Sequence, residues 1–282
     1  MAQIKTRFER DAQSLKAHVQ FLAENKKTFK IAHGTYTTKI ITEHGDVTYE
    51  TTQFSQRVFI AAKMIKKDVL ASEIGRKAIE GTYSKQNFGF HKNLVPFTSD
   101  VVLNLDISSA YATCLLVNGL ITQKTFEYLK TLKKAERLPS VGMLATSRCN
   151  WVYENGVCID INVERADTAN VFFYLINEIN YIMRSIEWEL GKHFFFYWVD
   201  GVFFNSETPK RLVTSVEKIL IDNNYRYKYE NVHSFVLKKD FRDICTIEMV
   251  KNDEFKRYQF SAKKDSSDIR KQLHEIANNH IT

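Results

Sequence analysis

The sequence predicts an α+β fold, in which helices back one face of an antiparallel sheet. Long segments carry apolar residues at helical spacing, whereas short segments are rich in β-branched and aromatic residues and are joined by turn-like sequences. From about residue 100, the order strand, helix, hairpin, helix, strand is typical of this class. A length of 282 residues with 44% hydrophobic content is enough for one large domain or two small ones.

In the first hundred residues, helical and hairpin patterns alternate. Phe8, Leu15, Val19 and Leu22 recur near helical spacing among charged residues, and they predict an amphipathic helix. β-Branched segments on both sides of the turn-like sequence 43–46 predict a hairpin. In order, we expect a helix over 3–25, a hairpin over 35–52, a helix over 56–79 and an irregular segment over 81–99.

The rest of the chain is more regular. Asp167 and Thr168 form a capping sequence at the start of a long helix. The apolar run Phe194–Trp198 predicts one strand of a buried aromatic hairpin. The expected elements are a strand over 101–106, helices over 109–118 and 124–137, a strand pair over 150–163, a long helix over 167–190, an aromatic hairpin over 194–204, a helix over 208–223, strands over 226–238, 244–250 and 254–260, and a short helix in the tail from Ser266.

Net charge and cysteine content indicate which partners and which cellular environment suit the protein. The formal net charge of +7 permits a polyanionic partner. The four cysteines form no CxxC pair, which disfavours structural zinc and a disulfide framework and favours reduced thiols. The first residues do not resemble a signal peptide, and no apolar run approaches the roughly 18 residues of a membrane span. We therefore expect a cytoplasmic protein with no membrane partner.

Two aspartates stand at the ends of apolar strands. Asp106 follows Leu103–Leu105, and Asp200 follows Phe194–Val199. A carboxylate at the mouth of a buried strand is costly to desolvate unless a cation compensates its charge. Two such carboxylates, each followed by small residues, indicate a divalent-metal site for phosphoryl chemistry. The alternative is that both are ordinary turn aspartates at strand ends.

The segment Asp106–Thr113 resembles the first palm motif of family B DNA polymerases, D-x-x-S-L-Y-P-S. Asp106, Ser109 and Tyr111 match in register, whereas alanines replace the Leu and the Pro. The resemblance implies that Asp106 binds both metal ions, that the main-chain carbonyl of Ile107 can add a ligand, and that amides of the turn face a triphosphate. It also implies that the ring of Tyr111 lies beneath the sugar and excludes a 2′-hydroxyl.

The segment Phe196–Phe203 resembles the third motif of the same family, Y-x-D-T-D-S followed by a hydrophobic residue. Asp200 falls on the second aspartate, which binds metal in the family. Trp198 replaces the first aspartate, and Gly201 replaces the Ser. The first aspartate is regarded as less directly involved in metal binding, so the resemblance implies a retained core of two carboxylates.

Two shorter segments resemble further elements of the family. Lys134 and Gly142 have the spacing of the second motif, K-x-x-x-N-S-x-Y-G, and a cation there suits a triphosphate leaving group. Lys256 and Tyr258 match the K-x-Y element that contacts the primer strand. For each of these short matches, the alternative is ordinary surface charge. All four elements occur in the order that the family shows.

The resemblance implies a template-directed DNA polymerase that transfers dNTPs to a primer 3′-hydroxyl with two Mg²⁺ ions, for which Mn²⁺ can substitute. Its expected partners are primed or single-stranded DNA, dNTPs and a priming or processivity protein. The site residues that it implies are Asp106 and Asp200 for catalysis, Asp106, Ile107 and Asp200 for metal binding, Ile107, Ser109, Ala110, Tyr111, Lys134 and Arg137 for nucleotide binding, and Gly142, Lys256 and Tyr258 for primer–template binding.

The resemblance covers about residues 75–262 and implies a reduced palm. We expect a helix–hairpin–helix accessory region over 1–80, a palm over 81–262, and a C-terminal tail or helix over 263–282. Within the palm, very short fingers lie at about 114–145, and there is little or no thumb. We expect no proofreading exonuclease, because only about a hundred residues precede Asp106 in this sequence. An exonuclease-free enzyme of this size suggests a virus, a plasmid or another mobile element, with replication in the host cytoplasm if it is viral.

Two other classes of protein remain open. A degenerate palm that binds nucleic acid or a replication partner without catalysis is indicated by Trp198 and Leu138, which replace the family's Asp and Asn. A reverse transcriptase or another palm nucleotidyltransferase carries similar carboxylates. Reverse transcriptases, however, have two adjacent aspartates at the corresponding motif, whereas Gly201 follows Asp200 here. The sequence contains no P-loop or Rossmann glycine pattern and no histidine pair at metal-ligand spacing.

Overall fold

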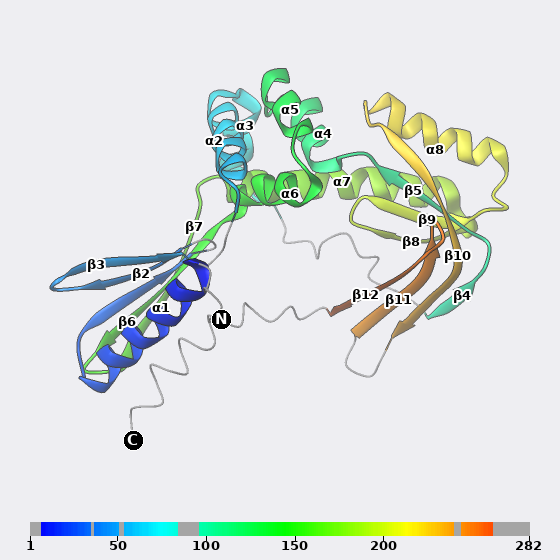
Figure 1. The fold of residues 1–282 in the computed structure, drawn as a ribbon. Helices are drawn as coiled ribbons and strands as arrows, with labels where there is room; N and C mark the ends of the chain where they lie inside the picture. The colour runs from blue at the N-terminus through cyan, green and yellow to red at the C-terminus, as the bar shows by residue number, and fades with distance from the viewer. Residues whose placement is uncertain (1–6, 35–36, 51–53, 84–95, 240–243, 262–282) are drawn as a thin grey trace. The chain divides into compact units, whose positions relative to one another are not determined.

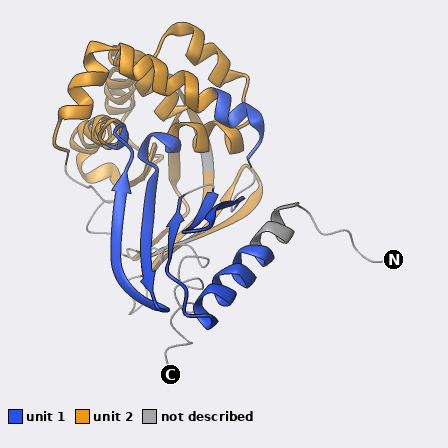
Figure 2. Cartoon of the chain, turned by 90° about the vertical axis from the view of Figure 1, so that its left-hand side faces the viewer, with its two compact units in different colours: residues 1–60, 142–169, 265–282 blue, residues 61–141, 170–264 orange. Residues whose placement is uncertain are grey.

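A computed structural model describes residues 7–34, 37–50, 54–83, 96–239 and 244–261. These residues form an α+β fold with two antiparallel sheets (Figure 1), which confirms the general α+β class predicted from the sequence. The chain divides into two compact units, which Figure 2 shows in different colours. The first unit contains residues 1–60, 142–169 and 265–282, and the second contains 61–141 and 170–264.

The first unit is built on a five-stranded sheet whose strands run in the order β3-β2-β1-β6-β7. All neighbouring strands in this sheet are antiparallel. Its strands are β1 (Phe29–His33), β2 (Thr37–Thr42), β3 (Gly45–Glu50), β6 (Ser147–Glu154) and β7 (Val157–Arg165).

The core of the first unit forms between this sheet and helix α1 (Arg7–Glu24). Leu15 and Val19 of the helix cluster with Ile31 of β1 and Trp151 of β6, and all four are buried. The register pairs Ile31 with Trp151, so the two side chains project from the same face of the sheet. That face is the one that α1 covers.

The pairing of β1 with β6 joins segments that are far apart in the sequence. The sequence-based division into 1–80, 81–262 and 263–282 assigns the β6–β7 hairpin to the palm, whereas in the structure this hairpin belongs to the sheet of the first unit. The pairing also gives β1 a place that local patterns do not predict, because a strand of five residues carries little periodicity of its own.

The second unit contains the other sheet, with its strands in the order β12-β11-β10-β5-β9-β8, and β4 pairs with β10 beside this path. The aromatic hairpin predicted from the sequence is present and contributes Phe196 and Phe203 to the core of this unit. The centroids of their rings are 4.5 Å apart, and both rings pack with Phe235. The strands of the sheet are β4 (Phe97–Ser99), β5 (Val102–Ile107), β8 (Phe194–Trp198), β9 (Gly201–Asn205), β10 (Tyr227–Lys239), β11 (Ile244–Lys251) and β12 (Glu254–Ser261).

The remaining helices lie mostly in the second unit. The rings of Tyr111 and Phe172 stack at 6.0 Å and join the first turn of one helix to the long helix that precedes the aromatic hairpin. The α-helices are α2 (Gln56–Ala71), α3 (Glu73–Glu80), α4 (Ala110–Val117), α5 (Gln123–Lys130), α6 (Lys134–Gly142), α7 (Ala169–Leu190) and α8 (Lys210–Asp222), and the short 3₁₀ helices are Met143–Ala145 and Gly191–His193.

Two helices expected to be continuous are broken. The expected helix over 56–79 ends and restarts at Ser72, whose side-chain oxygen accepts a hydrogen bond from the Gly75 N–H at 3.2 Å. Gly75 lies so close to α2 that an added Cβ would come within 2.0 Å of the Val69 carbonyl oxygen. The expected helix over 124–137 is also divided, because α5 ends at Lys130 and α6 begins at Lys134. This second break puts Lys134 in the first turn of a new helix.

Some expectations fall outside the described residues. They are the helix expected from Ser266, most of the irregular segment 81–99, and the outer ends of the helix 3–25 and the hairpin 35–52. Within the described ranges, no helix is long and apolar enough to cross a membrane.

Candidate functional site

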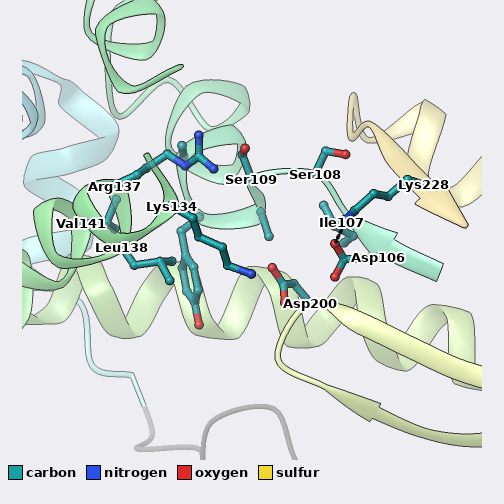
Figure 3. A pocket seen from close by; sticks show the side chains of 13 residues that line it. Asp106, Ile107, Ser108, Ser109, Lys134, Arg137, Leu138, Val141, Asp200 and Lys228 are labelled. Carbon is teal, nitrogen blue, oxygen red and sulfur yellow. Dashed lines mark ion pairs between the residues drawn. The ribbon is translucent and has the colours of Figure 1, made fainter. Parts of the chain in front are cut away.

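A pocket of about 230 Å³ lies at the end of β5 in the second unit. The antiparallel register pairs Asp106 of β5 with Gly201 of β9, and the Ile107 N–H donates to the carbonyl of Asp200 at 2.9 Å. These two interactions bring the predicted catalytic aspartates together, and both line the pocket (Figure 3). The lining residues are Asp106, Ile107, Ser108, Ser109, Ala110, Tyr111, Ala112, Lys134, Arg137, Leu138, Val141, Asp200 and Lys228.

Asp200 lies in the two-residue turn that joins β8 to β9. Trp198 pairs with Gly201 on either side of this turn. The first turn residue, Val199, has φ 57°, a left-handed conformation that is unfavourable for a β-branched side chain and is usually occupied by Gly in tight hairpins. A Cβ added to Gly201 would stand 3.5 Å from Asp106 Oδ1. The missing side chain at residue 201 therefore leaves the Oδ1 side of Asp106 open.

The two carboxylates have unusual protonation behaviour. Burial and the negative charge of Asp106 raise the pKa of Asp200 to about 6, although the positive charge of Lys134 opposes the rise. Burial likewise raises the pKa of Asp106, against the opposing charge of Lys228. Two carboxylates that disfavour each other's ionisation are stabilised when a cation binds between them.

This donor set fits Mg²⁺. Magnesium prefers oxygen ligands and is commonly bound by one or two carboxylates together with waters and substrate phosphates. Among the residues that the structure describes, no group of three or more His, Cys, Asp or Glu side chains could hold a metal ion. The ligands implied by the family B resemblance are the carboxylates of Asp106 and Asp200 and the main-chain carbonyl of Ile107, and all three residues line the pocket.

The turn between β5 and α4 supplies main-chain donors. Ser109 adopts a left-handed conformation (φ 55°, ψ 43°) and its side chain makes no capping hydrogen bond. The first intrahelical bond of α4 runs from the Thr113 N–H to the Ser109 carbonyl, and the helix residues before it line the pocket. Because the first N–H groups of a helix have no partner within it, the start of α4 is suited to bind an anion.

Two cations lie on the opposite wall, on α6. Lys134 and Arg137 both line the pocket, and Figure 3 shows the Lys134 amino group directed toward Asp200. Leu138 and Val141 follow on the same helix and complete the wall with apolar surface. The helix thus faces the carboxylates with positive charge.

Tyr111 also lines the pocket, from the first turn of α4. Its ring stacks on Phe172 of α7 with an angle of 11° between the ring planes. Burial and the nearby charge of Asp200 raise the pKa of its hydroxyl far above the ordinary value. The ring is therefore held in one orientation, and the hydroxyl stays protonated at neutral pH.

The three residues expected to bind primer–template do not line this pocket. Tyr258 of β12 contacts Trp198 edge to face at 4.8 Å, and Lys256 forms an ion pair with Glu254 on the same strand. Gly142 is the last residue of α6, and the division of the chain assigns it to the first unit.

The sequence reasoning missed one charged residue of the pocket, Lys228. It lies on β10 directly opposite Asp106, and its amino group is 3.6 Å from Asp106 Oδ2. The sequence offers only a weak signal, an alternation of Lys228 and Glu230 in a strand. The register that places Lys228 beside Asp106 is a property of the folded sheet.

Comparison of the chain with models of known protein families, with curated protein sequences and with solved structures finds no match. Any function assigned to the chain therefore rests on its own residues and on the geometry of the pocket.

Proposed function

We propose that the chain is a metal-dependent nucleotidyltransferase with a polymerase-like palm, and specifically a template-directed DNA polymerase. The observation that carries this proposal is one pocket that contains two carboxylates at strand ends, Asp106 and Asp200, together with the start of α4 and Lys134. Phosphoryl transfer needs mainly positioning and charge stabilisation, which such groups supply. The resemblance of the two aspartate segments to family B DNA polymerase motifs narrows the proposal to DNA synthesis.

In this proposal, Asp106, Asp200 and the carbonyl of Ile107 hold Mg²⁺. Bound there, Mg²⁺ supplies activation of a primer 3′-hydroxyl and neutralises charge on the phosphates. The amides of Ser109 and Ala110, at the start of α4, orient the triphosphate. Lys134 and Arg137 stabilise the charge that develops on the leaving group.

Tyr111 is the residue proposed to select deoxynucleotides. Its ring is fixed by Phe172 at the edge of the pocket, so it presents a rigid surface rather than an adaptable one. A rigid ring beneath the sugar excludes a 2′-hydroxyl by steric conflict. Lys256 and Tyr258 are proposed to contact primer–template from β12. The partners that follow are primed DNA, dNTPs and a priming or processivity protein, and the setting is replication of a virus or mobile element.

Primer extension tests the proposal. A short primed DNA template is incubated with Mg²⁺ or Mn²⁺ and with dNTPs or NTPs. Extension with dNTPs is expected for the wild-type chain, and it is expected to fall at least about 100-fold in Asp106→Asn and in Asp200→Asn. Asp222→Asn, an exposed change at the end of α8, is the matched control and is expected to retain full activity. Undiminished extension by both pocket variants would refute the assignment.

A non-catalytic palm that binds nucleic acid is the second candidate. It is favoured by one observation, the lysine beside Asp106, because Lys228 already supplies a cation where a metal is expected. Binding of Mn²⁺ separates the two candidates. A non-catalytic palm binds DNA equally with and without Mn²⁺, and the Asp106→Asn/Asp200→Asn variant does not change that binding.

A further inference from the structure

A chain of alternating charges extends from Asp106 across the sheet of the second unit. The Lys228 amino group lies 3.6 Å from Asp106 Oδ2 and 2.5 Å from Glu230 Oε1. The second oxygen of Glu230 forms an ion pair with Lys251 of β11. Lys251 then donates to Asn104 Oδ1 at 3.1 Å, and Asn104 lies on β5, two residues before Asp106. This series of side-chain interactions thus begins and ends on β5, the strand that carries the proposed metal ligand Asp106.

The side chains in the middle of this series, Glu230 and Lys251, are poorly exposed to solvent. The side chain of Glu230 is 11% exposed and that of Lys251 is 22% exposed, whereas Lys228 is 54% exposed. Asn104 is buried and donates its amide to the carbonyl of Val202 at 3.1 Å. Side chains with so little exposure to solvent remain charged only when they are paired with an opposite charge. Glu230 is therefore a fixed anchor, and it holds the amino group of Lys228 on the Oδ2 side of Asp106.

We propose that Lys228 is a built-in competitor of the divalent metal. Its ammonium group occupies the Oδ2 side of Asp106 and lowers the affinity of the pocket for Mg²⁺ or Mn²⁺, and Glu230, anchored by Lys251 and Asn104, keeps it there. The inference rests on the proposed function insofar as Asp106 is taken as a metal ligand. It goes further, because it assigns the control of metal affinity to residues on a strand outside both aspartate motifs.

The physical reason is the repulsion between two cations at one carboxylate. A metal ion bound to Asp106 would share this carboxylate with the Lys228 ammonium, and charges at such short range interact strongly even at an effective dielectric constant of about 20. Either the lysine is displaced from Asp106 or the metal is bound less tightly. Both outcomes reduce metal affinity relative to a pocket without the lysine. Lys134 differs from Lys228 because it faces the pocket from a helix on the opposite wall.

Titration with Mn²⁺, with free Mn²⁺ followed by electron paramagnetic resonance, tests the inference at fixed pH and ionic strength. Lys228→Met removes the cation and is expected to tighten Mn²⁺ binding about tenfold or more. Lys228→Arg retains the charge and is expected to bind as the wild type does. Lys238→Met is the matched control, because Lys238 lies on the same strand, is 63% exposed and is paired with Glu248 at 2.7 Å, away from the pocket.

A double-mutant cycle separates positioning from a merely structural role. Glu230→Gln is expected to tighten Mn²⁺ binding in the wild-type background, because Lys228 is then no longer held on the Oδ2 side of Asp106. In the Lys228→Met background the same change is expected to have a much smaller effect. Equal effects of Glu230→Gln in both backgrounds would show that Glu230 does not act through Lys228, and would overturn the positioning role.

The outcomes distinguish this inference from the proposed function. If Lys228→Met binds Mn²⁺ with wild-type affinity while Asp106→Asn/Asp200→Asn loses it, the metal site stands and the competitor role is refuted. If neither the wild type nor Lys228→Met binds more Mn²⁺ than that aspartate variant does, the metal site itself is refuted, and both proposals fall together.

Discussion

Asp200 occupies its position at a cost to the stability of the fold. Burial and the charge of Asp106 raise its pKa to about 6 from an ordinary value of 3.8. Folding therefore favours the protonated form. The stabilising contribution of this group is fully present below pH 4 and is lost as the pH rises through 6.

Asp200→Asn is expected to stabilise the metal-free protein at neutral pH. Asparagine cannot ionise, so it avoids the penalty of a buried carboxylate, which we place at about 1–3 kcal/mol from the size of the pKa shift. Urea unfolding in EDTA at pH 7.5 and at pH 4 measures the effect. The variant is expected to be more stable than the wild type at pH 7.5 and equal to it at pH 4. A wild type that is the more stable protein at pH 7.5 would contradict the burial argument.

Single residues of the pocket were predictable from the sequence to different degrees. Asp106, Asp200 and Lys134 were named as candidates because their neighbours form recognisable motifs, and all three line one pocket. Lys228 was not predictable, because only the pairing of β10 with β5 puts it beside Asp106. A contact between two strands depends on register, and register is set by the whole sheet and its turns.

At the scale of elements, the turn between β8 and β9 contains a residue in an unfavourable backbone conformation. Val199 adopts a left-handed conformation that a β-branched residue tolerates poorly, whereas Gly adopts it without strain. Val199→Gly is therefore expected to raise the free energy of unfolding by about 1 kcal/mol.

Urea unfolding measures this change as well. Val163→Gly is a suitable comparison, because Val163 is an exposed residue of β7 in ordinary strand conformation. There, glycine is expected to reduce stability, by roughly 0.5–1 kcal/mol. Loss of stability in both variants would show that the turn is not strained.

Element prediction succeeded where the local pattern is strong. The long helix α7 and the aromatic hairpin both lie close to their expected ranges, because many apolar residues repeat with one period. It failed at Ser72, where a single capping residue ends one helix and starts another, and at β1, which is too short to show a period. Local patterns report the type of an element better than its ends.

At the scale of the whole molecule, the two units are interleaved in sequence. The β6–β7 hairpin lies between segments of the second unit along the chain, and it completes a sheet begun by residues of the first sixty. No local sequence pattern predicts the pairing of β1 with β6, because this pairing depends on contacts between distant segments. The expected accessory region over 1–80 therefore differs from the first unit in both content and limits.

Deletion of residues 1–60 is expected to cause aggregation and not to yield a soluble second unit. It would remove α1 and β1, expose the buried face of Trp151 and leave β6 with an unpaired edge. Size-exclusion chromatography of the truncated and full chains under identical conditions measures the outcome. A monomeric truncated chain with a native near-ultraviolet spectrum would show that residues 142–169 do not need β1.

The turn at residues 199–200 also has an evolutionary meaning. It contains a strained valine followed directly by an aspartate whose charge opposes folding. Random substitution would readily replace either residue by one that folds better, since most chains lie far from their stability optimum. A chain selected only to fold would be expected to lose both. Their presence side by side in one turn is what we expect of a segment that is retained for a function and not for stability.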